Sequence, residues 1–498
     1  MLLRRYRTAL GRLARRNEST RVAIASTAPA APWQGQDTGS LPDFDDYANA
    51  FRSKTIVSLL RSVLVLSLCQ MPPLVNNAER LLKTSYRFLG RGITDALLRF
   101  SFYGHFCAGE GPSGRHSIQP VVGYLHRQGV GSILDYAAEG DAEEQGPAKD
   151  NDAKAGIQCR VYDYRDEELC DRRAQTFEAC IRAVQQVSPT GFAAIKVTAL
   201  GPPALLLRMS AAVSELRSLF GAFDSTGSGR VDLAQFTAAY VSFFDDGPEG
   251  AARLFARLDA AGEGTVDYVD WSNSIKIEEL NSITGRCKER GPLARAALDE
   301  GEVLLLVAMR RRVEGLCALA RDLGVRVMID AEHCKFQPAI DNIANTLSRA
   351  FNLSQPVVFA TYQLYLRDAP LRLRQDMDRA HKGGYAFACK VVRGAYMQHE
   401  RQAAREQGLP DPVHASLEDT HAAYDAAVGA VVGAMAQGRR AEVMVATHNQ
   451  ASVEAALRVM RSSGMTPCSG VYFGQVRVRV SCREGSLLLL VIRVILAL

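Results

Sequence analysis

Residues 387–396 (FACKVVRGAY) combine an apolar run with two cations, an arrangement that can support chemistry. Lys390 stands among apolar residues, and Arg393 comes immediately before Gly394. An apolar run that ends at glycine predicts a strand buried on both faces, as in a parallel sheet. A lysine in such a strand is costly to bury unless an anionic or electron-rich group faces it. The stretch therefore indicates either a ligand site or, alternatively, a barrel strand whose two cations reach solvent at its end.

Two further stretches place polar side chains at the end of an apolar run. Residues 326–332 (RVMIDAE) hold Asp330 and Glu332 two positions apart, and so on one face of a strand. Residues 442–449 (EVMVATHN) also turn polar at their C-terminal end. Because βα-barrels build their sites at the C-terminal ends of parallel strands, the three stretches together predict one site at one end of a barrel.

The motifs DAE, FQPAI, TYQLYL, KVVRGAY, VATHN and YFGQ, taken in chain order, resemble those of the proline dehydrogenase (mitochondrial proline oxidase) family. The match is collinear from residue 44 to residue 475. The resemblance implies a flavin enzyme that uses FAD to oxidise L-proline to Δ1-pyrroline-5-carboxylate and passes electrons to quinone. It also implies a location in the mitochondrial matrix, at the surface of the inner membrane. Hydroxyproline is the alternative substrate, and the FQPAI and TYQLYL forms favour proline.

The resemblance also assigns roles to individual residues. A flavin that accepts a hydride gains negative charge, so a cation beside it stabilises the reduced form, and Lys390 suits that position. Arg393 suits the pyrophosphate, because arginine pairs well with phosphate. Lys196 would contact the substrate, although a snorkelling structural lysine is the alternative. Asp330, Lys390 and Tyr396 are the expected catalytic residues. The expected flavin-binding residues are Ala331, Gln363, Lys390, Arg393, Gly394, Ala395, Thr447 and His448.

Two of these expectations are open to another interpretation. His448 taken by itself would be a buried, hydrogen-bonded core histidine, and its place in the motif ATHN favours the cofactor pocket. FAD rests on the resemblance alone, because no GxGxxG turn precedes a helix in this sequence.

The elements that must position these residues alternate between strand and helix, which predicts an α/β fold of the (β/α)8 TIM type with parallel strands. Long helical patterns at residues 303–323 and 416–436 separate the strands. A closed barrel needs eight strands, and the sequence offers seven. The seven are residues 131–136, 192–200, 326–332, 356–365, 387–396, 442–449 and 471–475.

The stretch after Gln475 departs from the family pattern. The family continues into a last strand and then a helix whose arginine pair holds the substrate carboxylate, whereas this chain reads VRVRVSCREGSLLLLVIRVILAL. We therefore expect the last strand and helix to be missing, the barrel to keep two open edges, and little or no activity. Residues 476–480 alternate like a strand and could fill the gap. The alternative function is a catalytically inactive barrel that acts as a calcium-binding or interaction protein.

Residues 214–275 interrupt the barrel pattern with two loops that resemble EF-hand loops. Position twelve of each loop, which should be glutamate, is Gln235 in the first and Asp270 in the second. Position three of the second loop is Ala261, which has no side-chain oxygen. We therefore expect an EF-hand-like helical pair that binds calcium weakly or not at all. The candidate ligands in the first loop are Asp224, Thr226, Ser228, Arg230 and Asp232.

The remaining sequence sets the class of protein. Eleven cysteines without a CxxC pair, in a chain of 498 residues, fit a reducing compartment. The net charge of +5 comes from scattered residues, which argues against nucleic acid as a partner. Residues 1–32 have the composition of a mitochondrial presequence, and a disordered basic tail is the alternative. The expected divisions are a presequence (1–32), a helical arm (41–120), the first part of the barrel (128–213), the EF-hand-like insertion (214–275), the remaining barrel (276–475) and an atypical tail (476–498).

Overall fold

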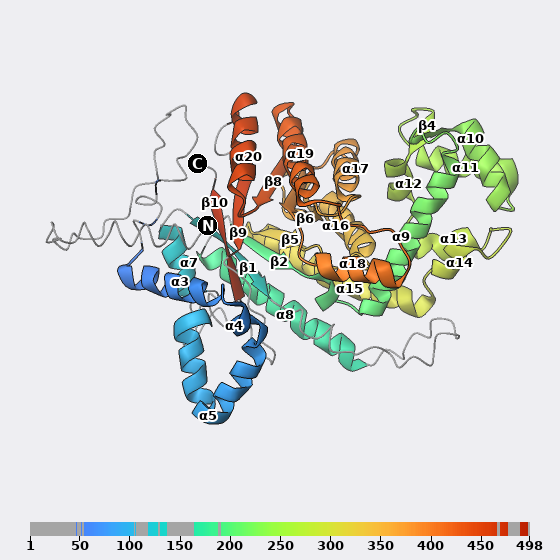
Figure 1. The fold of residues 1–498 in the computed structure, drawn as a ribbon. Helices are drawn as coiled ribbons and strands as arrows, with labels where there is room; N and C mark the ends of the chain where they lie inside the picture. Colours follow the sequence, from blue (N-terminus) through green and yellow to red (C-terminus); the bar gives the residue numbers. More distant parts are fainter. Residues whose placement is uncertain are drawn as a thin grey trace.

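The computed structural model describes residues 46, 51, 54–103, 105, 118–127, 130–136, 164–187, 191–465, 469–476 and 489–496. The predicted presequence and most of the stretch 476–488 lie outside these residues. The described residues form a closed eight-stranded barrel, with a helical arm on one side of it and a smaller helical unit on the other (Figure 1).

Seven parallel strands of the barrel lie where the sequence predicts them. The predicted ranges run past the end of most of these strands. The largest excess is at the strand that begins at Phe192, which ends at Ile195 before the chain makes a 3-10 turn, η3 (Val197–Ala199). Pro202 and Pro203 follow, and proline favours the start of the next helix over continued strand pairing. The parallel strands are β1 (Val130–Tyr136), β2 (Phe192–Ile195), β5 (Arg326–Ile329), β6 (Val358–Gln363), β7 (Phe387–Val392), β8 (Ala441–Ala446) and β9 (Val471–Val476).

The eighth position of the barrel is filled, so the expectation of two open edges is wrong. β10 (Leu489–Leu496) pairs with β1 on one side and β9 on the other, and both pairings are antiparallel. Its sequence, LLVIRVIL, is rich in β-branched residues, which favour strands. Pairing both edges satisfies backbone N–H and C=O groups that would otherwise stay unpaired. The candidate stretch 476–480 does not supply this strand, since Val476 belongs to β9 and residues 477–480 are not described.

The interior of the barrel changes from apolar to charged along the strands. One buried cluster fills its base: Ile133, Phe192, Ala194, Met328, Phe359, Ala388, Met444 and Tyr472. Side chains alternate between the two faces of a strand, so the residue two positions further on points inward as well. On five neighbouring strands that residue is polar: Asp135, Lys196, Asp330, Thr361 and Lys390. The polar layer lies towards the C-terminal ends of the strands, which we call the barrel mouth.

Helices cover the outside of the barrel and begin and end at clear signals. α15 begins with a capping box between Asp299 and Glu302 and ends at Gly324, whose φ of 70° suits glycine. Ser416 and Asp419 form a second capping box at the start of α19. The outer helices are α8 (Tyr164–Val187), α15 (Glu300–Leu323), α16 (Gln337–Phe351), α17 (Ala369–Lys382), α18 (Met397–Glu406), α19 (Leu417–Ala436) and α20 (Gln450–Ser462).

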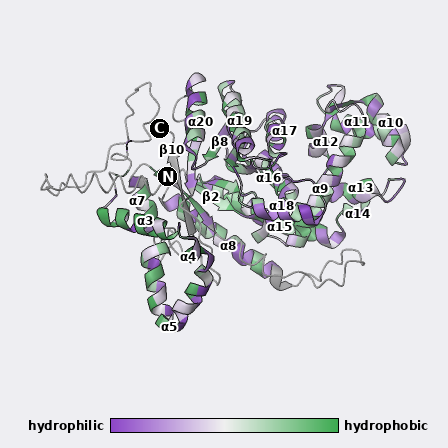
Figure 2. Ribbon diagram, in the orientation of Figure 1, coloured by the Kyte–Doolittle hydropathy of each residue, from purple (hydrophilic) through white to green (hydrophobic). Residues whose placement is uncertain are grey.

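The helical arm comprises α3 (Ile56–Leu68), α4 (Pro72–Asn76), α5 (Ala78–Leu98), the π-helix η1 (Arg99–Tyr103) and α7 (Gln119–Arg127). Gly90 has a φ of 74° and bends α5. Figure 2 shows many hydrophobic residues in α3 and α5, and the exposed ones include Val57, Leu60, Phe88 and Ile93. Among the described residues, no helix is long and apolar enough to cross a membrane.

The unit at the other side of the barrel, residues 214–275, contains two helix–loop–helix segments and is called the inserted unit below. The short strands β3 (Arg230–Asp232) and β4 (Thr265–Asp267) join the two loops in an antiparallel ladder. Phe223, Phe236 and Trp271 pack together at its centre. Its helices are the end of α9 (Pro203–Phe223), α10 (Leu233–Phe243), α11 (Gly247–Leu258) and α12 (Tyr268–Ser274).

Candidate functional site

Three charged side chains meet inside the barrel mouth. The Lys196 ammonium lies 3.5 Å from one carboxylate oxygen of Asp330, and the Lys390 ammonium donates to the other. Their exposed fractions are 5%, 8% and 8% for Lys196, Asp330 and Lys390. We call these three residues the mouth network. The structure therefore brings together the predicted substrate lysine and two of the predicted catalytic residues, and Lys390 is buried and does not reach solvent.

Neighbouring charges keep Lys196 and Asp330 ionised in spite of their burial. Burial acts to raise the pKa of Asp330, but the charges of Lys390 and Lys196 lower the pKa by more, so the net shift is downward. Burial acts to lower the pKa of Lys196, but the carboxylates of Asp135 and Asp330 outweigh it and raise the pKa. The sequence reasoning missed Asp135, although it lies in the predicted first strand and its neighbour in β2, Ala194, is part of the interior cluster.

Glu332 and Gln363 tie together the segments that follow three strands. The Glu332 carboxylate accepts hydrogen bonds from the backbone N–H, at 3.2 Å, and the hydroxyl of Thr198. Burial raises the pKa of Glu332. The Gln363 amide donates to the Glu332 carbonyl at 2.9 Å, and its oxygen accepts from the N–H of Ala395 at 3.3 Å. The side chain of Gln363 thus links the backbone at Glu332 to the backbone at Ala395 by hydrogen bonds, a role that the sequence did not suggest.

Arg393 lies at the end of β7 with its guanidinium held by neutral groups. It donates to Nδ1 of His421 at 2.9 Å, to the Thr447 hydroxyl at 2.7 Å and to the Ser452 hydroxyl at 2.9 Å. The guanidinium also stacks on the ring of Tyr424 at 4.4 Å. Thr447 was predicted for this site, whereas His421 and Ser452 come from helices that carried no such signal.

The surroundings of Arg393 fit an anionic group. Burial lowers the pKa of Arg393, and no carboxylate of the described part of the chain lies within ion-pair distance of it. A guanidinium has five N–H donors, and three are used here. Two donors, and a positive charge that no ion pair among the described residues neutralises, therefore remain for a group such as a phosphate.

The turn after β7 is closely packed. Gly394 has a φ of 141°, and a Cβ atom placed there would lie 1.4 Å from the Tyr365 ring, so only glycine fits. Tyr396 follows as a half-buried side chain whose ring centroid lies 4.2 Å from that of His333. Burial is the main reason that the pKa of Tyr396 rises to about 12. Tyr396 is therefore a neutral aromatic wall at neutral pH.

The other predicted residues have backbone positions near the mouth network but are not part of it. Ala331 is partly buried next to Asp330, and Ala395 is exposed at the turn after β7. His448 is exposed at the end of β8, which excludes the alternative of a buried core histidine.

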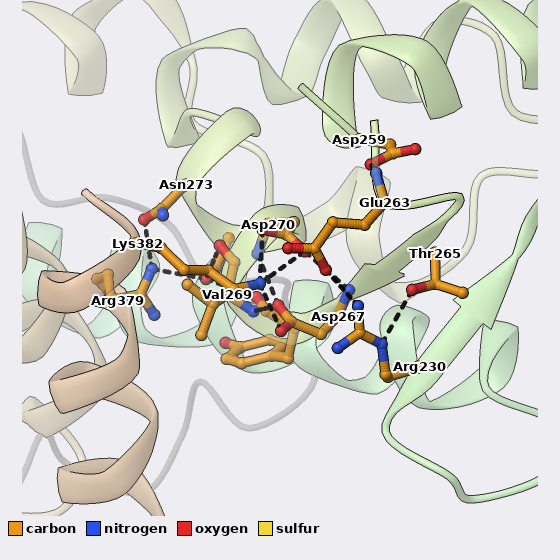
Figure 3. Close-up of polar contacts among 12 residues, drawn as sticks. Arg230, Asp259, Glu263, Thr265, Asp267, Val269, Asp270, Asn273, Arg379 and Lys382 are labelled. Carbon is orange, nitrogen blue, oxygen red and sulfur yellow. Dashed lines mark hydrogen bonds and ion pairs between the residues drawn. The ribbon is translucent and has the colours of Figure 1, made fainter. Parts of the chain in front are cut away.

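The candidate calcium ligands serve the local fold. The Asp224 carboxylate accepts from the N–H groups of Ser228, at 3.0 Å, and Gly229, at 2.7 Å. Asp232 caps α10, and Arg230 donates to Glu263 of the second loop (Figure 3). Thr226 and Ser228 turn their hydroxyls towards the same Asp224 oxygen. Across the described residues, no group of three or more His, Cys, Asp or Glu side chains is placed to hold a metal ion.

Comparison with known proteins identifies the family. A family model described as proline dehydrogenase matches residues 122–477. The chain is 35% identical to mitochondrial proline dehydrogenase 1 of Homo sapiens, over 92% of this chain and 84% of that protein. It is 28% identical to hydroxyproline dehydrogenase of Bos taurus, over 89% of this chain and 82% of that protein. Proline utilization A from Bdellovibrio bacteriovorus aligns with a TM-score of 0.47 and 13% identity, covering 95% of this chain and 37% of that chain. The family model and the human relative together show that this chain belongs to the proline dehydrogenase family.

Proposed function

We propose that this chain oxidises L-proline to Δ1-pyrroline-5-carboxylate, with FAD bound beside the mouth network. The observation that supports this best is the buried group of Lys196, Asp330 and Lys390 at the C-terminal ends of the barrel strands. Proline is favoured over hydroxyproline because the relatives named for proline are 30–35% identical and those named for hydroxyproline 27–28% identical.

The flavin would supply the acceptor for a hydride from the ring carbon beside nitrogen, which no side chain can accept. Lys390 places positive charge where negative charge develops, and Asp330 holds both lysines in position. Arg393 has the spare donors for the pyrophosphate, while Gln363 fixes the backbone at Ala395. Tyr396 would exclude water from one side of the site.

Substrate binding would depend heavily on Lys196. Lys196 is the cation that we assign to the substrate carboxylate, because its ammonium lies inside the barrel mouth. A lost charge-assisted hydrogen bond to that group would cost about 1.5–3 kcal/mol.

A spectrum and an assay test this function. Purified protein supplied with FAD should retain a visible flavin absorbance and reduce a dye with proline, faster than with 4-hydroxyproline. Protein that binds no flavin, or that shows no dye reduction at saturating proline, would overturn the proposal.

We further propose that the chain works at the mitochondrial inner membrane and gives its electrons to quinone. The relatives at 30% identity or more are named as mitochondrial proteins. Quinone is dissolved in lipid, so the protein must reach a bilayer surface, and the arm offers exposed apolar side chains next to the basic residues of α5. Replacing Phe88 and Ile93 with serine should reduce sedimentation with anionic vesicles. If the variant sedimented as much as the wild type, the arm would not be the contact with the membrane.

Import is tested separately with a fluorescent protein fused to residues 1–32. A signal that stays in the cytosol would exclude mitochondrial import.

A further inference from the structure

The second loop of the inserted unit, residues 259–270, has four acidic side chains, and each already has a partner. The Asp259 carboxylate accepts from the N–H groups of Glu263, at 2.7 Å, and Gly264, at 2.8 Å. The Glu263 carboxylate pairs with Arg230 of the first loop. The remaining two acids, Asp267 and Asp270, lie side by side at the start of α12.

One ammonium group neutralises both of these acids. Nζ of Lys382 lies 2.6 Å from Asp267 Oδ2 and 2.9 and 3.0 Å from the two oxygens of Asp270 (Figure 3). Lys382 is the last residue of α17, a barrel helix, and is 112 residues away from Asp270 in sequence. The contact is therefore a bond between the inserted unit and the barrel.

Electrostatics favour the ammonium at this position. Burial raises the pKa of Asp270, and the charge of Asp267 adds to that rise. Burial also acts to raise the pKa of Asp267, but the hydrogen bond from Lys382 helps to lower it below its usual value. Two adjacent, partly buried carboxylates need a cation, and Lys382 provides it.

A second cation of α17 strengthens the same junction. Arg379 donates to the Ser272 hydroxyl at 2.9 Å and to the Asn273 amide oxygen at 2.5 Å, both on α12. The same guanidinium bonds Asp376 at 3.1 Å, and Asp376 accepts from the Tyr362 hydroxyl of β6 at 2.8 Å. The junction is thus connected to a strand of the barrel wall.

A cavity lies next to the contacts of Lys382 and Arg379, between the inserted unit and the barrel. Its volume is about 930 Å³. Residues of α9 and α12, such as Arg217 and Ser272, line one side, and residues of α16 and α17, such as Asn345 and Asp376, line the other. Beside this cavity, the polar contacts of Lys382 and Arg379 link α12 to α17.

We propose that Lys382 is the resident cation of the second loop and fastens the inserted unit to the barrel without a metal ion. Because the ammonium is tethered to α17, it is present at a high effective concentration, and a divalent cation must displace it to bind. The inserted unit is then a permanently docked module of the barrel, independent of calcium. This proposal does not rest on the oxidation of proline.

Hydrogen exchange and thermal unfolding of the full chain test it, each in chelator and in about 1 mM calcium, the weak-binding range of such loops. Wild-type protein should show no response to calcium. Lys382→Met should lose exchange protection in residues 265–274 and unfold about 2–4 °C lower in chelator. Calcium should restore part of that loss, because Asp267 and Asp270 then face each other without a cation. Lys382→Arg should behave like the wild type.

Matched variants make the result decisive. Lys276→Met removes an exposed lysine close to α12 for which the described residues offer no ion pair, and it should change nothing. Asp267→Asn with Asp270→Asn breaks the junction from the other side, so it should lose protection with no recovery in calcium. If Lys382→Met does not fold, this double variant still tests whether the contacts of Lys382 protect residues 265–274. The proposal is wrong if Lys382→Met keeps wild-type protection, if calcium has no effect on it, or if calcium protects the wild type equally.

Discussion

The mouth network and the junction at Lys382 use the same chemistry in different surroundings. In each, lysine ammonium groups and aspartate carboxylates neutralise one another across elements distant in sequence. In the mouth, two lysines share one carboxylate inside the barrel, whereas at the junction two carboxylates share one lysine at a partly exposed seam. The ratio of bases to acids in the ion pairs is therefore reversed between the two places, although Asp135 and Glu332 add negative charge around Lys196 in the mouth.

The largest expected effect is on stability, from removing the shared carboxylate of the mouth. Asp330→Asn leaves the buried Lys390 without its counter-ion and Lys196 with only the charges of Asp135 and Glu332, and breaking a buried ion pair in this way costs about 3–5 kcal/mol. Denaturant unfolding at neutral pH should show a loss of this size. A loss of unfolding free energy under 1 kcal/mol is roughly the contribution of a solvent-exposed ion pair. That result would mean that water reaches the ion pairs of the mouth as easily as those of the junction.

The same variant predicts a pH dependence. The pKa of Asp330 is lowered in the folded protein, so its ionised form adds stability above the unfolded pKa of about 3.9. That stability is lost as the pH falls through the lower, folded-state pKa. The difference in unfolding free energy between wild type and Asp330→Asn should therefore be constant above about pH 5 and shrink below about pH 4. A difference that shrinks already near neutral pH would show that the pKa is raised.

The next effect is on the chemical step. Lys390→Met should lower kcat for proline by about a hundredfold or more, since removing one electrostatic donor at a reacting centre has that effect. Lys390→Arg should recover part of the rate. Equal flavin content in all three proteins is the control, and an unchanged kcat would remove Lys390 from the mechanism.

A smaller effect concerns substrate binding. Lys196→Met should raise KM for proline by roughly ten- to a hundredfold, because it loses a charge-assisted bond to the substrate carboxylate. The effect on kcat should be weaker. Steady-state kinetics separates the two, and a pure loss of kcat would assign Lys196 to chemistry and not to binding.

The smallest effect is at the junction. Lys382→Met should change kcat and KM by less than about twofold, the size expected of a change remote from the reacting centre. The same dye-coupled assay measures it, with Lys276→Met as the matched control. A tenfold loss of kcat would show that the inserted unit controls the site through α17.

The barrel and its mouth were predictable because they depend on local pattern. Apolar runs located all seven parallel strands, and alternation along them placed Asp330 and Lys390 on one interior face. Lys196 is predictable in the same way, since it comes two residues after the interior Ala194. Position within a strand fixes the direction of a side chain, and parallel pairing brings the strand ends together.

Contacts made by helix surfaces were not predictable. Lys382 and Arg379 are ordinary cations in the last turn of a helix, and nothing in their spacing points to α12. His421 and Ser452 reach Arg393 from two different helices for the same reason. The strand β10 escaped prediction because the βα rhythm implies parallel pairing, while its actual partners run antiparallel. These features depend on how elements pack in space, which local periodicity does not record.

The antiparallel strand β10 also sets the order in which this protein can fold. It joins β1 to β9, pairing Ser132 with Arg493, so closing the barrel requires contact between segments from opposite ends of the described chain. Contacts of such long sequence separation form late, because the cost in chain entropy precedes the gain. Until then the edges of β1 and β9 are open templates for other chains. Chaperone demand and aggregation during synthesis should therefore depend on β10 more than on any residue of the site.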